Sequence, residues 1–452
     1  MQSAPVHAGS RRSLLGVGSR TARCRHRPRR RRRPLRGLPD GRLPIHPRSD
    51  QGTVQGVVWV RGGHHRPRAR PSTECITRLY IRLEVYTMAF EILDQGMIAR
   101  QPSTGPDAVA ACSRCVVTGT GDLVCSFAVQ EALGQNDFKQ VIVRSEDGGS
   151  TWTKPAYLWP HLHDDFAHIG SISQAPDGTC FIAGIRIPVD EPGESFWRDE
   201  TQGIKQNAMF WASSADQGLT WTDPAPIVLP AAGSAEAPGA LTVTRDGTWI
   251  CCYSPYNTFD PSVEVDRNQV VYLCSTDQGR SWTHGTMLRF DDAGSTAAEA
   301  WVVELADGRL LGACWHIAPH GKPDYPNAYA LSHDGGMTWT PTRSTGTLGQ
   351  SISLTAQEDG RALMVYNQRQ HGDPGIRLAI ARPTDDDFGI EMDELVWKAE
   401  VRTQSDTSGG HDDWQDYSFG EPAVTVLPDG AFLVVFWLIQ PDVRGIGYVK
   451  VR

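Results

Sequence analysis

The chain has 452 residues, of which 44 are basic and 52 acidic, giving a formal net charge of −8 at pH 7. That charge is divided unevenly, because residues 1–87 carry a net charge of +16 and residues 88–452 a net charge of −24. The acidic part argues against nucleic acid as its partner. No stretch approaches the roughly 18 apolar residues of a membrane-spanning helix, which argues against a membrane protein.

Residues 1–87 have the composition of a disordered extension. They contain 20 arginines, no lysine and four acidic residues, and they lack the periodicity that buries a core. The arginine run at 29–33 could bind nucleic acid electrostatically. The simpler interpretation is that Met88 is the natural start and that the preceding segment is not part of the native protein. No charged region, apolar core and cleavage site follow one another as in a secretory signal.

One eight-residue pattern, which we call the Asp box, occurs four times in the acidic part. It reads Ser-x-Asp-x-Gly-x-Thr/Ser-Trp, and its copies occupy residues 145–152, 214–221, 275–282 and 332–339. Each copy stands between two runs that suit β-strands, so it predicts a hairpin turn. The Ser and Asp side chains would bond nearby backbone amides, the Gly would take an unusual φ, and the Trp would pack beneath the turn. The regular spacing indicates a repeat architecture.

A second set of tight turns runs in phase with the first. Six glycines mark these turns, and an Asp precedes five of them. The six are Gly121, Gly178, Gly247, Gly308, Gly360 and Gly430. One repeat is therefore strand, hairpin, strand, loop, strand, Asp-box hairpin, strand, which describes a four-stranded antiparallel sheet.

Six such units over residues 88–452 predict an all-β fold, a six-bladed β-propeller of four-stranded antiparallel blades. The fifth unit has lost its Asp box and reads Thr-Asp-Asp-Asp-Phe-Gly at 384–389. The sixth supplies only three strands, so residues 91–98 are expected to add the fourth and close the ring. A stack of β-sandwich domains is the alternative.

The eight cysteines of the acidic part stand mostly inside apolar strands. Such cysteines usually act as small buried hydrophobes, and this usage favours a reducing, cytoplasmic location over a secreted disulfide framework, although secretion stays open. Cys112 and Cys115 have the spacing of a metal knuckle, but no second pair accompanies them. We therefore expect neither a metal nor a cofactor.

Two glutamates are predicted to face the central channel, which the innermost strands of a propeller line. Glu299 and Glu421 each lie nine residues before a hairpin glycine, at the start of an innermost strand. In the other blades this slot holds Cys112, Ile169, Pro238 and Ser351. Two acids across a channel suit glycosidic bond cleavage, because one protonates the leaving oxygen while the other attacks or activates water. Alternatively, each caps a strand or pairs with an arginine.

The loops at the channel mouth hold further candidates. His163 and Asp164 belong to a His/Asp cluster at 161–168 that could bind a metal, do acid–base chemistry or be an ordinary polar loop. Trp414 suits the apolar face of a sugar ring. Arginines that converge on the mouth would bind a carboxylate and so indicate an acidic sugar, although singly each is more often a structural ion pair. The arginines expected there are Arg114, Arg186, Arg369 and Arg377.

The Asp boxes and the six-unit period resemble those of the sialidase (neuraminidase) superfamily, also called BNR-repeat proteins, over essentially all of residues 88–452. In sialidases an arginine triad grips the sugar carboxylate, a Tyr–Glu pair forms the nucleophile and an Asp is the acid/base. The resemblance implies the glutamate role for Glu299, because residues 299–308 resemble the stretch that carries it. It implies Tyr417 or Glu421 as the partner and Asp137 as the acid/base candidate.

The chain departs from the sialidase pattern at the arginine triad. Sialidases open their first blade with Arg-Ile-Pro, whereas residues 112–115 here read Cys-Ser-Arg-Cys, and the chain's own Arg-Ile-Pro at 186–188 comes a blade later. His316 stands where a later triad arginine is expected. A related propeller that acts on another sugar is therefore at least as well supported as a sialidase.

The leading hypothesis is a sialidase-like glycoside hydrolase that removes a terminal sugar, acidic or neutral, from a carbohydrate substrate. Two alternatives stay open. Histidines such as His163 and His316 near arginines could instead perform β-elimination on a uronate, or the propeller could bind glycans without catalysis. The sequence sets neither the sugar, the linkage nor the oligomeric state.

Overall fold

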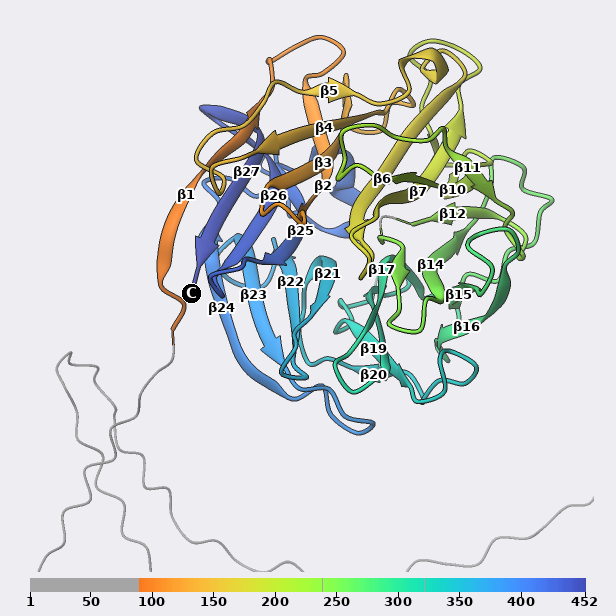
Figure 1. The fold of residues 1–452 in the computed structure, drawn as a ribbon. Helices are drawn as coiled ribbons and strands as arrows, with labels where there is room; N and C mark the ends of the chain where they lie inside the picture. Colours follow the sequence, from red (N-terminus) through yellow and green to blue (C-terminus); the bar gives the residue numbers. More distant parts are fainter. Residues whose placement is uncertain (1–88, 238, 321) are drawn as a thin grey trace, which may run out of the picture. The chain divides into compact units, whose positions relative to one another are not determined.

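Six antiparallel sheets surround a central axis in the computed structural model, which describes residues 89–237, 239–320 and 322–452 (Figure 1). Each sheet is one blade, with its first strand at the hub and its last at the rim. The prediction of an all-β, six-bladed propeller with four-stranded antiparallel blades is therefore confirmed. The expectations for residues 1–87 lie outside the described residues.

The first three blades follow one another along the chain. Blade 1 comprises β2 (Val109–Val117), β3 (Leu123–Gln130), β4 (Lys139–Ser145) and β5 (Ala156–Tyr157). Blade 2 comprises β6 (Phe166–Gln174), β7 (Cys180–Pro188), β10 (Ala208–Ser214) and β11 (Ala225–Ile227). Blade 3 has an inner strand in two pieces, β12 (Ser234–Glu236) and β13 (Thr242–Val243), followed by β14 (Trp249–Tyr256), β15 (Gln269–Ser275) and β16 (Thr283–Arg289).

The remaining blades complete the ring. Blade 4 comprises β17 (Thr296–Glu304), β18 (Leu310–Ile317), β19 (Ala328–Ser332) and β20 (Arg343–Ser344). Blade 5 comprises β21 (Gln350–Ala356), β22 (Ala362–Gln368), β23 (Gly375–Ala381) and β24 (Ile390–Lys398). Blade 6 comprises β25 (Phe419–Val426), β26 (Phe432–Gln440), β27 (Val443–Val451) and β1 (Ile92–Arg100). Outside the blades lie the hairpin β8 (Trp197–Arg198) and β9 (Gly203–Ile204) and two short helices, η1 (Pro160–Leu162) and η2 (His411–Asp416).

Blade 6 joins the two ends of the described chain. Strand β1 pairs antiparallel with β27, from Ile92 opposite Val451 to Arg100 opposite Gly445. Glu91 and Arg452 exchange two further backbone hydrogen bonds, of 2.9 and 3.0 Å. The closure expected from residues 91–98 is therefore confirmed, and it satisfies the outer edge of β27.

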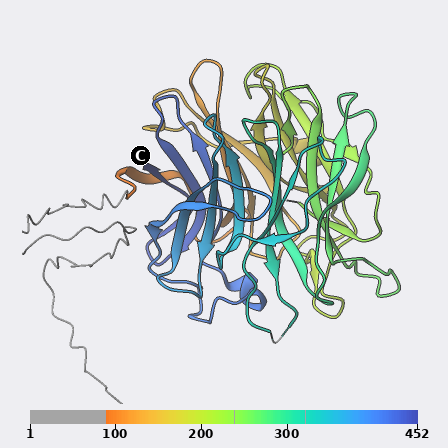
Figure 2. The same ribbon diagram turned by 90° about the horizontal axis from the view of Figure 1, so that it is seen from below.

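The hydrophobic core lies between neighbouring blades. Every residue of β3 is buried, so both faces of this sheet are covered by its neighbours. Between blades 4 and 5, for example, Trp301 and Tyr329 pack with Leu354 and Met364. Figure 2 shows the sheets side by side, with connecting loops at both ends of the hub axis.

The Asp boxes form the predicted turns between the third and fourth strands of blades 1 to 4. In the first, Ser145 Oγ donates to Asp147 Oδ1 (2.8 Å) and accepts from the Gly149 N–H (2.8 Å). Asp147 Oδ1 also accepts from the Thr151 N–H (2.8 Å), and Gly149 has a φ of 96°. The other three copies repeat these three hydrogen bonds.

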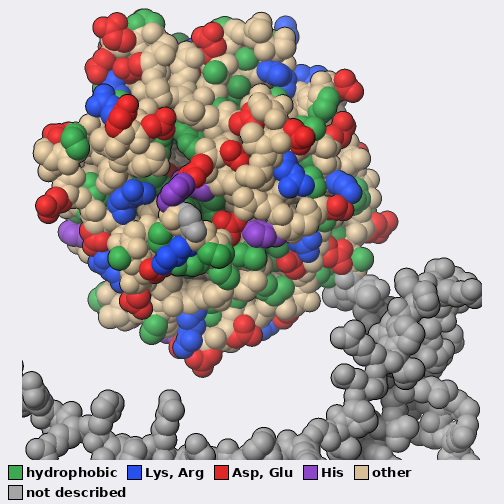
Figure 3. All heavy atoms as spheres, turned by 180° about the vertical axis from the view of Figure 1, so that it is seen from behind, with side chains coloured by type: hydrophobic (Ala, Val, Ile, Leu, Met, Phe, Trp, Pro, Cys, Tyr) green, Lys and Arg blue, Asp and Glu red, His purple; other side chains and the backbone are tan. Residues whose placement is uncertain are grey.

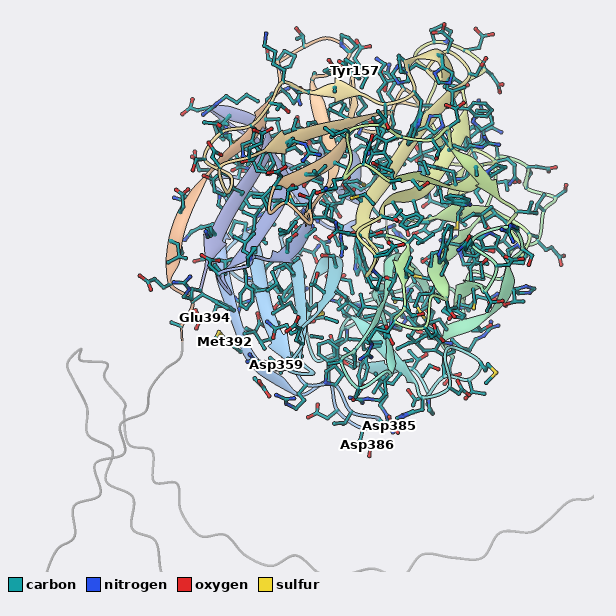
Figure 4. The ribbon with its side chains drawn as sticks, in the orientation of Figure 1. Tyr157, Asp359, Asp385, Asp386, Met392 and Glu394 are labelled. Carbon is teal, nitrogen blue, oxygen red and sulfur yellow. The ribbon has the colours of Figure 1, made fainter. Side chains whose placement is uncertain are left out.

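The turn of the fifth blade, which lacks an Asp box, is held by other contacts. Asp385 and Asp386 lie at the rim, in the turn between β23 and β24 (Figure 4). His333 Nε2 lies 2.8 Å from Asp385 Oδ1, and Arg343 Nη2 donates to Asp386 Oδ1 (2.9 Å). Both partners belong to blade 4. Within the turn, the Thr384 N–H donates to the Asp387 carbonyl (2.8 Å), and the Asp387 N–H donates to Thr384 Oγ1 (3.1 Å). Local bonds and contacts with blade 4 therefore take the place of the missing Asp box.

Substituting Ser214 by alanine should destabilise the propeller by about 1–2 kcal/mol, because the buried Gly218 N–H would lose its acceptor. The measurement is the free energy of unfolding from urea titration. The control is Ser150→Ala, which removes an exposed hydroxyl and should change stability by less than about 0.5 kcal/mol. Equal effects of the two substitutions would contradict the structural role of the Asp-box serine.

Cysteines, metals and membrane spans can be assessed over the described residues. The eight cysteines found there are all unpaired, and seven of them are buried. Within those residues no group of three or more His, Cys, Asp or Glu side chains could hold a metal ion. No helix in the described part of the chain is long and apolar enough to span a bilayer.

Candidate functional site

A cavity of about 200 Å³ lies at the hub, and we call it the inner pocket. All six blades contribute to its lining. Its polar lining residues include Cys112, Gln130, Glu236, Tyr256, Glu299, Ser351, Arg369, His411, Tyr417 and Glu421. Figure 3 shows the face that lies behind the view of Figure 1, which is hollowed near its middle, with histidine and acidic side chains at the edge of the hollow.

Backbone bulges position the polar residues of the inner pocket. In blades 1, 4, 5 and 6 the inner strand loses register at the predicted slot. The residues at these bulges have positive φ: Cys112 (53°), Glu299 (52°), Ser351 (52°) and Glu421 (45°). Left-handed backbone is uncommon for residues other than glycine, and such strain gathers at functional sites. The nine-residue spacing from a hairpin glycine therefore corresponds to a backbone bulge that recurs in these four blades.

Three glutamates, which we call the hub glutamates, share the inner pocket: Glu236, Glu299 and Glu421. Each accepts a hydrogen bond from a neighbouring blade. The Glu299 N–H donates to Glu236 Oε2 (2.7 Å), and Ser351 Oγ donates to Glu299 Oε1 (2.6 Å). The Cys112 N–H donates to Glu421 Oε2. The carboxyl groups are thus fixed in position by the strands beside them.

Burial and mutual repulsion favour protonated hub glutamates. Burial raises the pKa of Glu236 to about 8, and the charge of Glu421 adds to the rise. Burial also raises the pKa of Glu299, with contributions from Glu421 and Glu236. Burial raises the pKa of Glu421 as well. Each side chain is surrounded by protein and keeps only the surface that faces the cavity, so the three cannot all be ionised at neutral pH.

Arg369 supplies the positive charge of the inner pocket. It is 1% exposed, its guanidinium lies 3.6 Å from the centre of the Tyr417 ring, and Nη1 donates to Gln350 Oε1 (3.2 Å). Nη2 donates to the Phe419 carbonyl. The charge of Arg369 favours the ionised forms of Glu299 and Glu421. Burial nevertheless raises the pKa of Glu299 well above its usual value, so Glu421, which also accepts from Cys112, is the best-placed carrier of a negative charge in the hub.

Aromatic side chains form the walls of the inner pocket. The ring of Trp414 lies 5.6 Å from that of Phe196 and 5.9 Å from that of Trp197, measured between centroids. Trp197 in turn lies 6.2 Å from Tyr256. Phe196 and Trp197 come from the connection between β7 and β10, Tyr256 from β14 and Trp414 from η2. These rings resemble the flat apolar surfaces on which sugar rings pack.

A larger polar cavity of about 840 Å³ adjoins the inner pocket, and we call it the vestibule. Trp197, Trp315, His411 and Trp414 line both cavities and form the neck between them. The η2 segment, part of this lining, lies at the end of the hub axis that is lower in Figure 2. The site thus consists of the small aromatic inner pocket and the larger polar vestibule beside it.

Several predicted residues do meet at this site. Glu299, Glu421, Tyr417, Arg369 and Trp414 all line the inner pocket. The Tyr417 hydroxyl donates to the Gly410 carbonyl (2.8 Å).

His316 lines the vestibule but not the inner pocket. Its ring stacks on Phe290 with centroids 4.1 Å apart, and burial lowers its pKa to about 4, so it is neutral at pH 7.

Other predicted residues lie outside both cavities. Asp164 is exposed, and His163 Nε2 lies 2.9 Å from the Leu158 carbonyl oxygen. Arg186 lies over the Phe166 ring (4.8 Å). Arg114 is surrounded by protein and lies over the Trp301 ring (4.5 Å).

Two more sequence candidates also lie apart from the inner pocket. Arg377 pairs with Asp393 (2.8 Å). Asp137 is absent from the lining and accepts from the Glu131 N–H (3.1 Å). The expected convergence of several arginines is therefore not seen, because Arg369 is the one arginine among the described residues that line the inner pocket.

The expectation that only two blades aim a carboxylate into the hub is wrong, because Glu236 of blade 3 is a third. Counting nine residues back from Gly247 pointed to Pro238, but the inner strand of blade 3 is interrupted between β12 and β13. Glu236 stands two residues before that slot, on the same face of an extended chain. This even spacing of two residues is the feature of the sequence that could have identified Glu236.

The raised pKa of Glu236 predicts how stability depends on pH. A carboxyl with a folded pKa of about 8 and an unfolded value near 4.5 binds its proton more tightly in the folded state. Its contribution is complete below pH 4.5 and is lost as the pH rises toward 8, on the order of 5 kcal/mol in all. Thermal unfolding between pH 5 and 8.5 should show this fall in the wild type and a smaller fall in Glu236→Gln. Exposed Glu264→Gln is the control, and identical slopes in all three would contradict the assignment.

Solved structures of other proteins share this fold. A protein of unknown function from Dyadobacter fermentans has 20% sequence identity and a TM-score of 0.62, covering 80% of this chain and 99% of its own. A Hadza microbial sialidase has 17% identity and a TM-score of 0.54, covering 76% and 66%. An α-L-arabinanase from Penicillium chrysogenum, complexed with arabinobiose, has 16% identity and a TM-score of 0.53, covering 81% and 98%.

At the level of sequence, no curated protein matches the chain. A family model does match, that of the BNR repeat-like domain, over residues 194–434. The match covers just over half of the chain and includes three of the four Asp boxes. The protein therefore belongs to the BNR repeat-like domain family, as its Asp boxes predicted.

Proposed function

We propose that this protein is a glycoside hydrolase that removes a terminal, uncharged sugar from a glycan. The observation that supports this most is the set of three hub glutamates at an aromatic pocket, with raised pKa values and one arginine among them. Cleavage of a glycosidic bond needs one protonated and one ionised carboxyl group near the same bond. Because the surroundings of the three carboxyl groups differ, we expect one to be protonated and another to be ionised.

The roles follow from the charges around each carboxyl group. Glu236 is protonated below about pH 8, so it would donate a proton to the leaving oxygen. Glu299 and Glu421 share the charge of Arg369, so one of them would act as nucleophile or activate water. Arg369, whose guanidinium lies over the Tyr417 ring, would favour the ionised form of that carboxylate. The carboxylate itself would stabilise the positive charge that develops on the sugar ring.

The arginines favour an uncharged sugar in the inner pocket. Holding a sugar carboxylate takes a guanidinium group with free donors, and Arg369 is the one arginine among the described residues that line the inner pocket. That arginine already donates to Phe419 and Gln350. A neutral sugar such as the arabinose of the arabinanase complex therefore suits the pocket better than sialic acid.

A non-catalytic glycan-binding propeller is the second candidate. It is favoured by the hydrogen bonds that tie the hub glutamates to neighbouring blades, since such bonds serve structure whether or not chemistry takes place. The uronate lyase suggested by the histidines has less support, because His163 lies outside both cavities and His316 lines the vestibule but not the inner pocket.

A panel of nitrophenyl glycosides separates these functions. It should include α-L-arabinofuranoside, several neutral hexosides, a uronide and a sialoside, each tested with wild type, Glu299→Gln and Glu421→Gln. We expect release of nitrophenol from a neutral glycoside, and loss of that release in at least one of the two variants. Turnover of the sialoside alone would contradict the neutral-sugar proposal. Glycan binding with no turnover of any substrate would favour the second candidate.

A further inference from the structure

The vestibule contains one arginine that lacks a partner. Arg267 lines this cavity from the loop between β14 and β15, and its guanidinium lies 5.2 Å from the centre of the Tyr256 ring. Its Nε is buried and has no hydrogen-bond partner. No ion pair joins it to a carboxylate among the described residues, and its neighbour Asp266 pairs with Arg289 instead (2.7 Å).

The acidic residues that line the vestibule are engaged elsewhere. Asp199 accepts from Trp197 Nε1 (2.8 Å), and Asp324 lies 2.9 Å from His371 Nε2. Asp413 accepts from the Gly410 N–H (3.0 Å). None of these contacts involves Arg267.

The remaining polar contacts of the vestibule also leave Arg267 out. Asp412 lies 3.3 Å from His320 Nδ1 and 3.5 Å from His411 Nδ1. The second cation of the vestibule, Lys322, pairs with Asp292 (2.7 Å). Among the described cations of this cavity, Lys322 has an ion pair and Arg267 has none, while Asp199 and Asp413 accept hydrogen bonds from neutral donors.

A second unpartnered nitrogen lies on the adjoining blade. His316 Nε2 is buried without a hydrogen-bond partner and lines the same cavity. The two sites are tied through Thr296, whose hydroxyl donates to the Arg267 carbonyl (3.3 Å) and whose backbone pairs with Ile317, next to His316. The Arg267 loop is further fixed by Asn268 Nδ2, which donates to the carbonyls of Asp292 and Ser295 (3.0 and 2.9 Å).

We propose that the vestibule binds the leaving-group side of an acidic glycan, with Arg267 holding the carboxylate of a uronic acid next to the scissile bond. A buried guanidinium edge without a partner is costly, and a planar carboxylate supplies the missing acceptor. The volumes of the two cavities agree with this placement, because the small inner pocket fits one terminal sugar and the larger vestibule fits the sugars that follow. The placement of the uronate on the leaving-group side rests on the proposed function, but the binding of a carboxylate by Arg267 does not.

Calorimetric titration of the wild type with two disaccharides of the same linkage tests the inference. In the first, called the uronate below, a terminal galactose precedes a galacturonate, and in the second both sugars are galactose. We expect the uronate to bind about 10-fold more tightly, and this preference to weaken with added salt. Arg267→Gln should reduce the preference to within about 2-fold, and Arg267→Lys should keep part of it. Arg198→Gln is the control, since Arg198 is exposed and lies outside both cavities.

Equal affinities of the wild type for the two disaccharides, or an unchanged preference in a folded Arg267→Gln variant, would overturn the proposal. Tighter binding of a sulfated galactose disaccharide than of the uronate would overturn the assignment to a carboxylate. Failure of the proposed function has a different signature: the uronate preference would stand while no glycoside is hydrolysed. Conversely, hydrolysis without that preference would remove only the present inference.

Discussion

Replacing Glu236 by glutamine should lower kcat for a glycoside with a poor leaving group about 10³-fold, because the proton donor would be lost. Glutamine keeps the size of the side chain and an oxygen that can accept from the Glu299 N–H, so the fold should remain intact. The loss should be much smaller for a dinitrophenyl glycoside, whose leaving group departs without protonation. Steady-state kinetics on the two substrates measure the difference.

The other two hub glutamates provide the contrast. At least one of Glu299→Gln and Glu421→Gln should lose activity on both substrates, because an ionised carboxylate is needed whatever the leaving group. Exposed Glu264→Gln is the matched control and should behave as the wild type. If Glu236→Gln slowed both substrates equally, Glu236 would not be the proton donor. If no hub variant slowed either, the hub would not be the active site.

Replacing Arg369 by leucine should destabilise the protein by about 3–5 kcal/mol, the usual consequence of removing one member of a buried charge cluster. The Phe419 carbonyl and Gln350 would lose their donor, and Glu299 and Glu421 would lose the charge that favours their ionised forms. The effect should be larger at pH 8 than at pH 5, because the hub glutamates are protonated at the lower pH and need less compensation. Urea titration at the two pH values measures it.

The control for this substitution is Arg289→Leu, which removes an ion pair that is about half exposed and should cost less than about 1 kcal/mol. A loss below 1 kcal/mol in Arg369→Leu, or a loss equal at pH 5 and pH 8, would show that Arg369 does not compensate the hub carboxylates. Such a result would also remove one reason for placing the negative charge on Glu421.

The fold could be predicted from the sequence because its turns use local chemistry. An Asp box needs only its own serine, aspartate and glycine to form, as the repeated bonds around Asp147 and its three counterparts show. The slot of Glu299 and Glu421 could be predicted for a related reason, since a fixed distance from a hairpin glycine fixes the position along the strand. The nine-residue count missed Glu236 because the inner strand of its blade is interrupted.

The arginines could not be placed by their nearness to the channel mouth, because nearness alone does not tell which face of a strand a side chain takes. Arg186 stands between Ile185 and Ile187, and both isoleucines line the inner pocket. Side chains alternate along a strand, so Arg186 must point to the opposite face, where it meets Phe166. Arg267 lies in a loop, where no periodicity applies, and only the contacts of its neighbours show that it lacks a partner.

The pH dependence of kcat/KM tests the catalytic role of the hub most directly. With a nitrophenyl glycoside of the sugar found in the panel, the wild type should lose activity above about pH 8, where Glu236 loses its proton. The residual activity of Glu236→Gln on the dinitrophenyl glycoside should lack this alkaline decline. A decline at the same pH in both proteins, or a wild-type profile that stays flat to pH 9.5, would contradict the account.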